Sequence, residues 1–130
     1  MLVRSVDDVT GTEDDIQTEN WRSARIILAR EKVGFSVHET TLKAGSDNYF
    51  WYANHIEAVF ITEGEGQIID LATDEVHELK PGTVYLLNNH DKHRVLPRTQ
   101  IKCVCVFNPP VTGREVHDEN GVYPLITEDD

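Results

Sequence analysis

Short runs of β-forming residues, separated by turn sequences, recur along most of the chain and constrain its fold more than any other feature. Glycine and proline mark the turns at residues 43–48, 63–66, 80–82 and 108–110. The runs between them predict strands over Ala24–Leu28, Phe35–Leu42, Ala58–Thr62, Gln67–Leu71, Thr83–Leu87, Arg94–Leu96 and Ile101–Phe107. Short strands at this spacing predict an all-β sandwich or barrel with little helix.

The two ends of the chain are acidic and weakly patterned. One helical turn is predicted near Ser5–Val9, and no long amphipathic helix is evident. The ending Thr127-Glu128-Asp129-Asp130 predicts a mobile acidic tail from about residue 120. The alternative is a lid that orders over a pocket when substrate binds. The length of 130 residues predicts a single domain over residues 1–130.

The charge balance narrows the classes of partner. Twelve Lys and Arg against 23 Asp and Glu give a net charge of −11, which repels nucleic acid and anionic membrane surfaces. No segment approaches the roughly 20 apolar residues of a membrane helix, and the start of the chain lacks a signal-peptide core. We therefore expect a cytoplasmic protein that binds neither nucleic acid nor membrane.

The two cysteines, Cys103 and Cys105, lie two residues apart in a predicted strand, so both side chains point to one face. A disulfide between such near neighbours would be strained. We expect two buried free thiols that act as small apolar residues. The alternative is that they line a pocket.

Alternation in the strand around Glu57 places this carboxylate on the same face as Val59 and Ile61, with His55 on the same parity. If that face is the interior, ionised Glu57 needs a metal ion, a cation or several hydrogen bonds, because an unpaired buried carboxylate is very costly. The alternative is that Ala58 and its neighbours on the other face point inward and Glu57 is exposed.

Further along, Tyr85 begins a strand, and His90 and His93 follow a polar turn. Together with Glu57, a tyrosine oxygen and a histidine nitrogen suit a divalent metal ion that keeps open coordination positions. Open positions favour catalysis. The alternative is a core tyrosine and idle surface histidines.

The spacing of these residues resembles the two motifs of the cupin superfamily. Residues 45–64 have the frame of the first motif, with Glu57 in register and with Trp51 and Ala53 where two ligand histidines would stand. Tyr85 stands where the histidine of the second motif would be. The resemblance implies a single jelly-roll β-barrel without the ordinary four-ligand metal set.

The same departures resemble one branch of that superfamily, the ectoine synthases, along nearly the whole chain. The segments that carry this resemblance are residues 1–5, 19–25, 55–59, 63–66, 80–85, 90–93 and 105–117, the last being the most specific. Residues 49–54 and His38 differ from the residues expected in this family.

The resemblance implies a metal ion, iron(II) in that family, bound by Glu57, Tyr85 and His93. It implies a homodimer, and a substrate pocket formed by Trp21, Arg25, Thr40, Tyr52, His55, Cys105, Phe107, Glu115 and His117. The implied activity is that of a hydro-lyase, which cyclises N-γ-acetyl-L-2,4-diaminobutyrate to the compatible solute ectoine with loss of one water.

The chemistry of this ring closure suggests roles for the implied residues. Arg25 suits the substrate carboxylate by charge and fork geometry. Thr40, Tyr52 and His55 are candidates to give a proton to the departing oxygen. Glu115 and His117 could take the amine proton or hold the ammonium form, and the sequence does not separate these two roles.

Two other functions remain open. A catalytically silent cupin would bind a small ligand and need no metal. A cupin with other metal chemistry, such as oxygenation or sugar isomerisation, usually has more histidine ligands than this chain keeps. Glu, Tyr and His would also accept manganese or zinc in place of iron.

Overall fold

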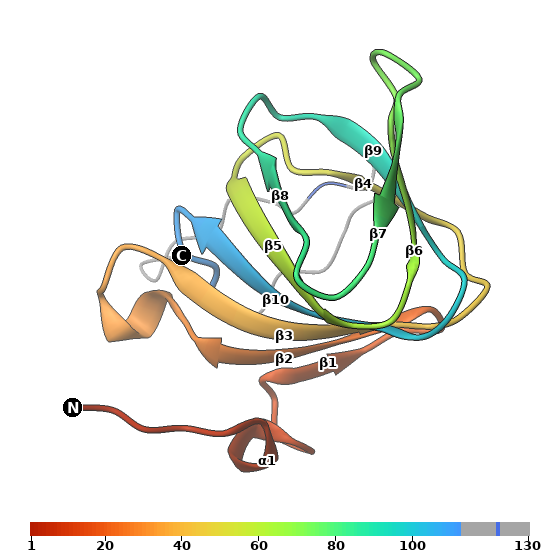
Figure 1. Ribbon diagram of the computed structural model, residues 1–130. Helices are drawn as coiled ribbons and strands as arrows, with labels where there is room; N and C mark the ends of the chain where they lie inside the picture. Colours follow the sequence, from red (N-terminus) through yellow and green to blue (C-terminus); the bar gives the residue numbers. More distant parts are fainter. Residues whose placement is uncertain (113–121, 123–130) are drawn as a thin grey trace.

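The structure, a computed structural model, describes residues 1–112 and residue 122. The described strands form two antiparallel sheets, shown in Figure 1. The first sheet has the order β1 (Asp15–Gln17), β2 (Trp21–Ile27), β3 (Ser36–Leu42), β10 (Ile101–Asn108), β5 (Ile56–Glu63) and β8 (Val84–Leu87). The second has the order β4 (Asn48–Trp51), β9 (Lys92–Pro97), β6 (Gly66–Asp70) and β7 (Val76–Leu79).

The predicted strands are confirmed, and the fold is nearly all β. The seven predicted runs coincide with β2, β3, β5, β6, β8, β9 and β10. The predicted helical turn is α1 (Val6–Val9), in which the side chains of Ser5 and Asp8 each accept a hydrogen bond from the other's backbone N–H. A short 3-10 helix, Ala29–Glu31, follows β2. The predicted acidic tail lies outside the described residues.

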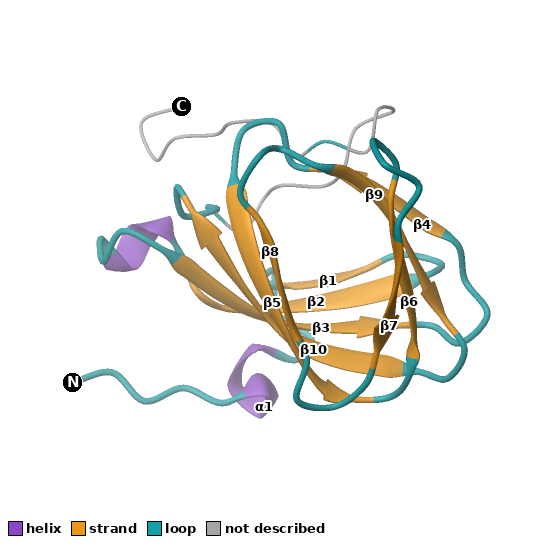
Figure 2. Cartoon of the chain, turned by 45° about the horizontal axis from the view of Figure 1, so that its top comes forward, coloured by secondary structure: helices purple, strands orange, loops and turns teal. Residues whose placement is uncertain are grey.

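The two sheets face each other and form a barrel around an apolar core (Figures 1 and 2). The turn predicted at residues 63–66 joins β5 to β6, but these strands belong to different sheets, so the turn carries the chain from one sheet to the other and does not close a hairpin. Gly64 has a φ of +90°, and a Cβ on it would lie 2.0 Å from the carbonyl oxygen of Gln100. Only glycine fits both the backbone angle and the space at this position.

Strand register brings residues that are far apart in sequence into one row across the first sheet. The row runs through Arg25, His38, Cys105, Val59 and Tyr85, which are successive partners on β2, β3, β10, β5 and β8. Glu57 is paired with Phe107 on β10 and with Leu87 on β8, two residues along from this row. Because side chains alternate across a strand, all of these residues face one side of the sheet.

The barrel is open between β7 and β8. These strands are consecutive in the chain, yet β7 is the last strand of the second sheet and β8 the last of the first. Figure 2 shows the two strands apart from each other, each at the end of its sheet. Both strands contribute to the lining of a cavity of about 500 Å³.

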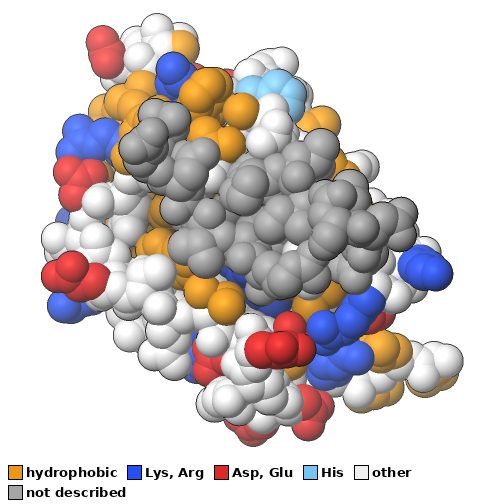
Figure 3. Space-filling view, turned by 180° about the vertical axis from the view of Figure 1, so that it is seen from behind, with side chains coloured by type: hydrophobic (Ala, Val, Ile, Leu, Met, Phe, Trp, Pro, Cys, Tyr) orange, Lys and Arg blue, Asp and Glu red, His pale blue; other side chains and the backbone are white. Residues whose placement is uncertain are grey.

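Acidic and basic side chains lie intermixed on the face shown in Figure 3. Asp15 pairs with Arg22 at 2.8 Å, and Asp14 pairs with Arg30 at 2.7 Å. Among the described residues, no helix combines the length and the hydropathy needed to span a membrane.

Candidate active site

Glu57 is buried on the inner face of β5, with 4% of its surface exposed. Val59 and Ile61 lie on the same face with 1% exposed each, whereas Phe60 on the other face is 45% exposed. The prediction that Glu57 points inward is therefore confirmed, and the alternative is wrong. Burial, with Cys105 alongside, raises the pKa of the Glu57 carboxyl well above its ordinary value.

Tyr85 lies on β8, the strand next to β5, where it is the register partner of Val59. Removal of its hydroxyl from water raises the pKa of Tyr85 well above its ordinary value, and the charge of Glu57 adds to this effect. The negative charge of Glu57 thus makes the anionic form of Tyr85 more costly. A cation between them would reverse both shifts.

His93, on β9, brings a nitrogen from the second sheet toward this pair. Its ring centroid lies 6.3 Å from that of Tyr85. Its Nδ1 is 2.9 Å from the backbone carbonyl oxygen of Asp91, which fixes the ring and leaves Nε2 as the free nitrogen. Nε2 is buried and has no hydrogen-bond partner among the described residues. Burial lowers the pKa of His93, so the neutral ring, the form that binds metals, is favoured.

These three side chains fit a divalent cation. They offer two oxygen donors that are unfavourable as anions without a counter-charge and one nitrogen that lacks a partner in the described structure. No three His, Cys, Asp or Glu side chains of the described residues lie close enough together to hold a metal ion by themselves. A metal site built on Glu57, Tyr85 and His93 would therefore need tyrosine as its third donor.

A narrow cavity of about 30 Å³ gathers most of the predicted substrate residues. It is lined by Trp21, Ser23, Thr40, Leu42, Phe50, Tyr52, Glu57, Tyr85, Cys103, Cys105 and Phe107. Two predicted ligands, Glu57 and Tyr85, therefore share one cavity with the predicted substrate residues. A space of this size holds about one water molecule, so a larger occupant requires side chains to move apart.

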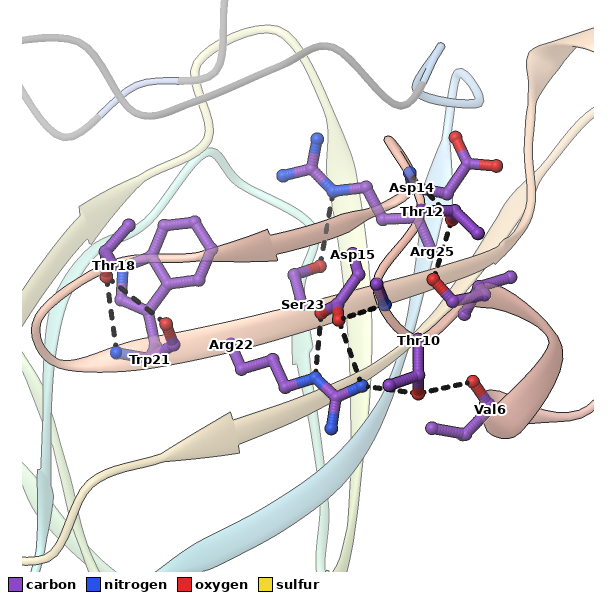
Figure 4. A network of polar contacts seen from close by, with 12 residues as sticks. Val6, Thr10, Thr12, Asp14, Asp15, Thr18, Trp21, Arg22, Ser23 and Arg25 are labelled. Atoms are coloured by element: carbon purple, nitrogen blue, oxygen red, sulfur yellow. Dashed lines mark hydrogen bonds and ion pairs between the residues drawn. The ribbon is translucent and has the colours of Figure 1, made fainter.

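Arg25 is buried beside this cavity, with 0% of its surface exposed. Figure 4 shows Arg25 and Trp21 on one side of β2 and Arg22 on the other, where Arg22 meets Asp15. Arg25 Nε donates to Ser23 Oγ at 3.3 Å. The strand alternation thus separates a guanidinium that faces the barrel interior from one that makes a surface ion pair.

An aromatic cluster joins the second sheet to the first around Phe107. The ring of Tyr52 meets Phe107 edge-on at 5.2 Å, and the ring of His55 does so at 5.7 Å. Tyr52 also lies 6.0 Å from His93. His55 is 1% exposed and is not among the residues that line the narrow cavity.

Both cysteines are buried free thiols, as predicted, and both also line the cavity. The Sγ of Cys105 donates to Thr40 Oγ1 at 3.4 Å and lies 3.8 Å from the Sγ of Cys103. This contact with Cys103, together with burial, raises the pKa of Cys105 well above its ordinary value. The neutral thiol therefore orients the Thr40 hydroxyl at the cavity wall.

Glu115 and His117 lie outside the described residues. Ser23 and Phe50 line the cavity but are not predicted as site residues; Ser23 lies in a segment that carries the family resemblance, and Phe50 has no signal in the sequence. His38 stands out in the sequence only as a departure from the family, and it is a buried neighbour of Phe107 with ring centroids 5.1 Å apart.

Comparison with known proteins agrees with the fold and with the sequence resemblance. The family model described as ectoine synthase matches residues 1–127. The L-ectoine synthase of Saccharopolyspora erythraea is 72% identical over 130 residues, which are 100% of this chain and 96% of that protein. The crystal structure of ectoine synthase from P. lautus covers 100% of this chain and 96% of its own, with a TM-score of 0.87 and 44% identity.

More distant structures share only the fold. A cupin domain of an XRE-family regulator from Enterobacter cloacae has a TM-score of 0.59 at 18% identity and covers 71% of this chain and 99% of its own. It supports the predicted cupin barrel and carries no information on activity. The full-length family match and the high identity to its members decide the assignment: this chain belongs to the ectoine synthase family.

Proposed function

We propose that this chain closes the ring of N-γ-acetyl-L-2,4-diaminobutyrate to give ectoine and water, with one divalent metal ion, iron(II), held by Glu57, Tyr85 and His93. One observation carries the metal set: Glu57 and Tyr85 face one cavity, and the unpartnered Nε2 of His93 lies on the inner face of the opposite sheet. Family membership supports the reaction.

The reaction replaces the C=O bond of the acetamide with a C=N bond in the new ring and releases the oxygen as water. The α-amine nitrogen attacks the acetamide carbon, and the amide oxygen leaves as water with two protons that the amine gives up. An amide is a poor electrophile, so its oxygen must be polarised while the neutral amine is held about 3 Å away. When bound, the metal ion supplies this polarisation as a Lewis acid.

The residues of the chain position the substrate for this attack. Arg25 binds the substrate carboxylate through its guanidinium fork, since it is buried and faces the interior of the barrel. Trp21 and Phe107 form apolar walls of the cavity and exclude water from the reacting atoms. Bringing the two ends of the substrate together in this way supplies much of the rate acceleration.

Proton transfer falls to the polar groups at the cavity wall. Tyr52 lines the cavity, and Thr40 offers a hydroxyl whose orientation Cys105 sets. His55, the third candidate proton donor, contacts the ring of Phe107 and does not itself line the cavity. Glu115 and His117 remain the predicted groups for the amine proton, and their roles as acid or base stay predictions.

Turnover by the metal-stripped full chain, reloaded with iron(II) without oxygen, tests the proposal. We expect ectoine only from the reloaded protein. Glu57→Ala should abolish it, and Glu63→Ala, which removes an exposed carboxylate from the end of the same strand, should leave it unchanged. Absence of product with any metal ion would favour a cupin that binds a small ligand without catalysis.

We propose in addition that two copies associate through the outer face of β5 and β8. Phe60 and Val84 are register partners on this face, as are Ala58 and Leu86. Phe60, Val84 and Leu86 are 45%, 60% and 53% exposed, and β8 has an unpaired edge. Light scattering should give the mass of a dimer for the unchanged chain and of a monomer for Leu86→Lys, with Val76→Lys as the control.

The cytoplasmic location stays a prediction.

A further inference from the structure

Two connections that cross from one sheet to the other lie side by side at one end of the barrel (Figure 1). Residues 52–55 lead from β4 to β5, and residues 88–91 lead from β8 to β9. The first connection carries Tyr52 and His55, two of the candidate proton donors, and the second leads to the proposed metal ligand His93. The placement of these groups relative to one another therefore depends on how the two connections are held together.

His90 joins the two connections through both its backbone and its side chain. Its carbonyl oxygen accepts a hydrogen bond from the indole Nε1 of Trp51 at 3.0 Å. Its Nδ1 lies 2.9 Å from the carbonyl oxygen of Tyr52. Because a carbonyl oxygen only accepts hydrogen bonds, Nδ1 carries a hydrogen and is the donor. One residue of the second connection thus bonds two consecutive residues at the start of the first.

His90 makes both of these bonds from a backbone conformation that is uncommon for a residue other than glycine. Its φ is +53°, in the left-handed region. The residue is exposed, so packing into the core does not account for this conformation. An exposed residue that is held in the left-handed region, with its carbonyl and its ring both bonded to a segment of the site, points to a role in placing that segment.

Tyr52 is the site residue that this contact restrains most directly. Its carbonyl oxygen also accepts a hydrogen bond from the His55 N–H, but at 3.5 Å, so the bond from His90 is the stronger restraint of the two. The Tyr52 side chain is 5% exposed and lines the narrow cavity, and its ring centroid lies 6.0 Å from that of His93. The bond from His90 therefore fixes the backbone from which Tyr52 reaches the cavity.

We propose that His90 is a positioning residue for the reaction and acts through Tyr52. It holds the first connection against the second, so that the Tyr52 hydroxyl stays where it can give a proton to the departing oxygen. This inference rests on the proposed role of Tyr52. The contribution of His90 is geometric, since a shift of about 1 Å in a group of the site can cost about a hundredfold in rate.

Two substitutions of His90 that are isosteric with each other test this role. Asparagine keeps an N–H donor near the position of Nδ1, whereas aspartate offers only acceptors to the Tyr52 carbonyl, and both tolerate the left-handed backbone. In the iron(II)-loaded full chain, we expect His90→Asn to keep kcat within about twofold of the wild type. His90→Asp should lower kcat about tenfold to a hundredfold and change KM less than about twofold. The control Asn89→Asp adds the same negative charge at the neighbouring exposed position and should leave both constants unchanged.

A double-mutant comparison decides whether His90 acts through Tyr52. In a Tyr52→Phe background, His90→Asp should lower kcat by less than about a further twofold, because the hydroxyl that it positions is already gone. Full additivity of the two effects would overturn the proposal, as would equal kcat values for His90→Asn and His90→Asp. If Tyr52→Phe alone keeps the wild-type kcat, the role of Tyr52 is wrong and the inference falls with it. A wild type without turnover would instead overturn the proposed function, on which this role depends.

Discussion

Arg25 and His38 are register partners on β2 and β3, and their side chains are 0% and 1% exposed. Burial penalises the charged imidazole, and Arg25 and His55 oppose a further positive charge. The pKa of His38 therefore lies well below its ordinary value of 6.5. The neutral ring donates or accepts at Nδ1, 3.4 Å from Ser23 Oγ, the same atom that Arg25 contacts.

This relationship predicts a loss of stability in mild acid. Below pH 6.5 the unfolded chain binds a proton at His38 that the folded chain resists, so the free energy of unfolding falls as the pH drops toward the folded-state pKa. The slope from one group is at most about 1.4 kcal/mol per pH unit. Urea unfolding between pH 7 and pH 5 should show a shallower slope for His38→Asn than for the wild type. Parallel slopes would contradict the depressed pKa.

Metal binding is predicted to release protons. The pKa values of Glu57 and Tyr85 are raised well above their ordinary values in the metal-free chain, and both groups must lose their protons to act as ligands. We expect about one to two protons per metal ion, measured by calorimetry with Co(II) in buffers of different ionisation enthalpy. Tyr85→Phe should release fewer protons than the wild type. The prediction is wrong if binding proves independent of the buffer.

Arg25→Lys should weaken substrate use far more than Arg22→Lys. Lysine keeps the charge but loses the two-pronged contact with a carboxylate, a loss of about 1.5–3 kcal/mol, or roughly tenfold to a hundredfold in kcat/KM. Most of the effect should appear in KM if Arg25 only binds the substrate. Arg22 lies on the other face of the same strand and pairs with Asp15, so steady-state kinetics should barely change there. Equal effects of the two substitutions would remove Arg25 from the site.

Gly64→Ala should destabilise the fold severely, because the new methyl group would meet the backbone of Gln100. We expect a loss of more than about 3 kcal/mol in the free energy of unfolding. Gly45→Ala is the matched control: Gly45 also has a positive φ, +77°, but nothing lies within 4 Å of its Cβ position. That substitution carries only the backbone strain, about 1 kcal/mol. Similar losses in thermal or urea unfolding would show that the close approach is unimportant.

The sequence predicts the strands whose apolar residues alternate clearly and misses those that lack such a pattern. In β7, Val76, His77 and Glu78 are all exposed, so no inward-facing period marks the strand. The strand β4 begins at Asn48, the last of the predicted turn residues 43–48, and β1 has only three residues. Short edge strands of this kind form because a neighbour offers hydrogen bonds, which local composition does not record.

The residues of the candidate site could likewise be predicted only where the pattern within one strand reveals them. The parity of Glu57 with Val59 and Ile61 is visible in the amino-acid sequence and indicates the burial that the structure shows. The placement of His38 opposite Arg25, and of Asp70 opposite His93, depends on the register of strands far apart in the chain. Strand register is a tertiary property, so neither pair could be found from spacing alone.

The three proposed metal donors come from both sheets: Glu57 and Tyr85 from the first, His93 from the second. These three residues lie within residues 57–93, yet much of the cavity wall beside Glu57 and Tyr85 is built by β2, β3 and β10, which come from both ends of the described chain. A protein engineer could therefore not transplant this chemistry by grafting a contiguous motif onto another scaffold. The reaction depends on the whole barrel, and recombination within the gene would separate the proposed metal ligands from the residues that line the cavity.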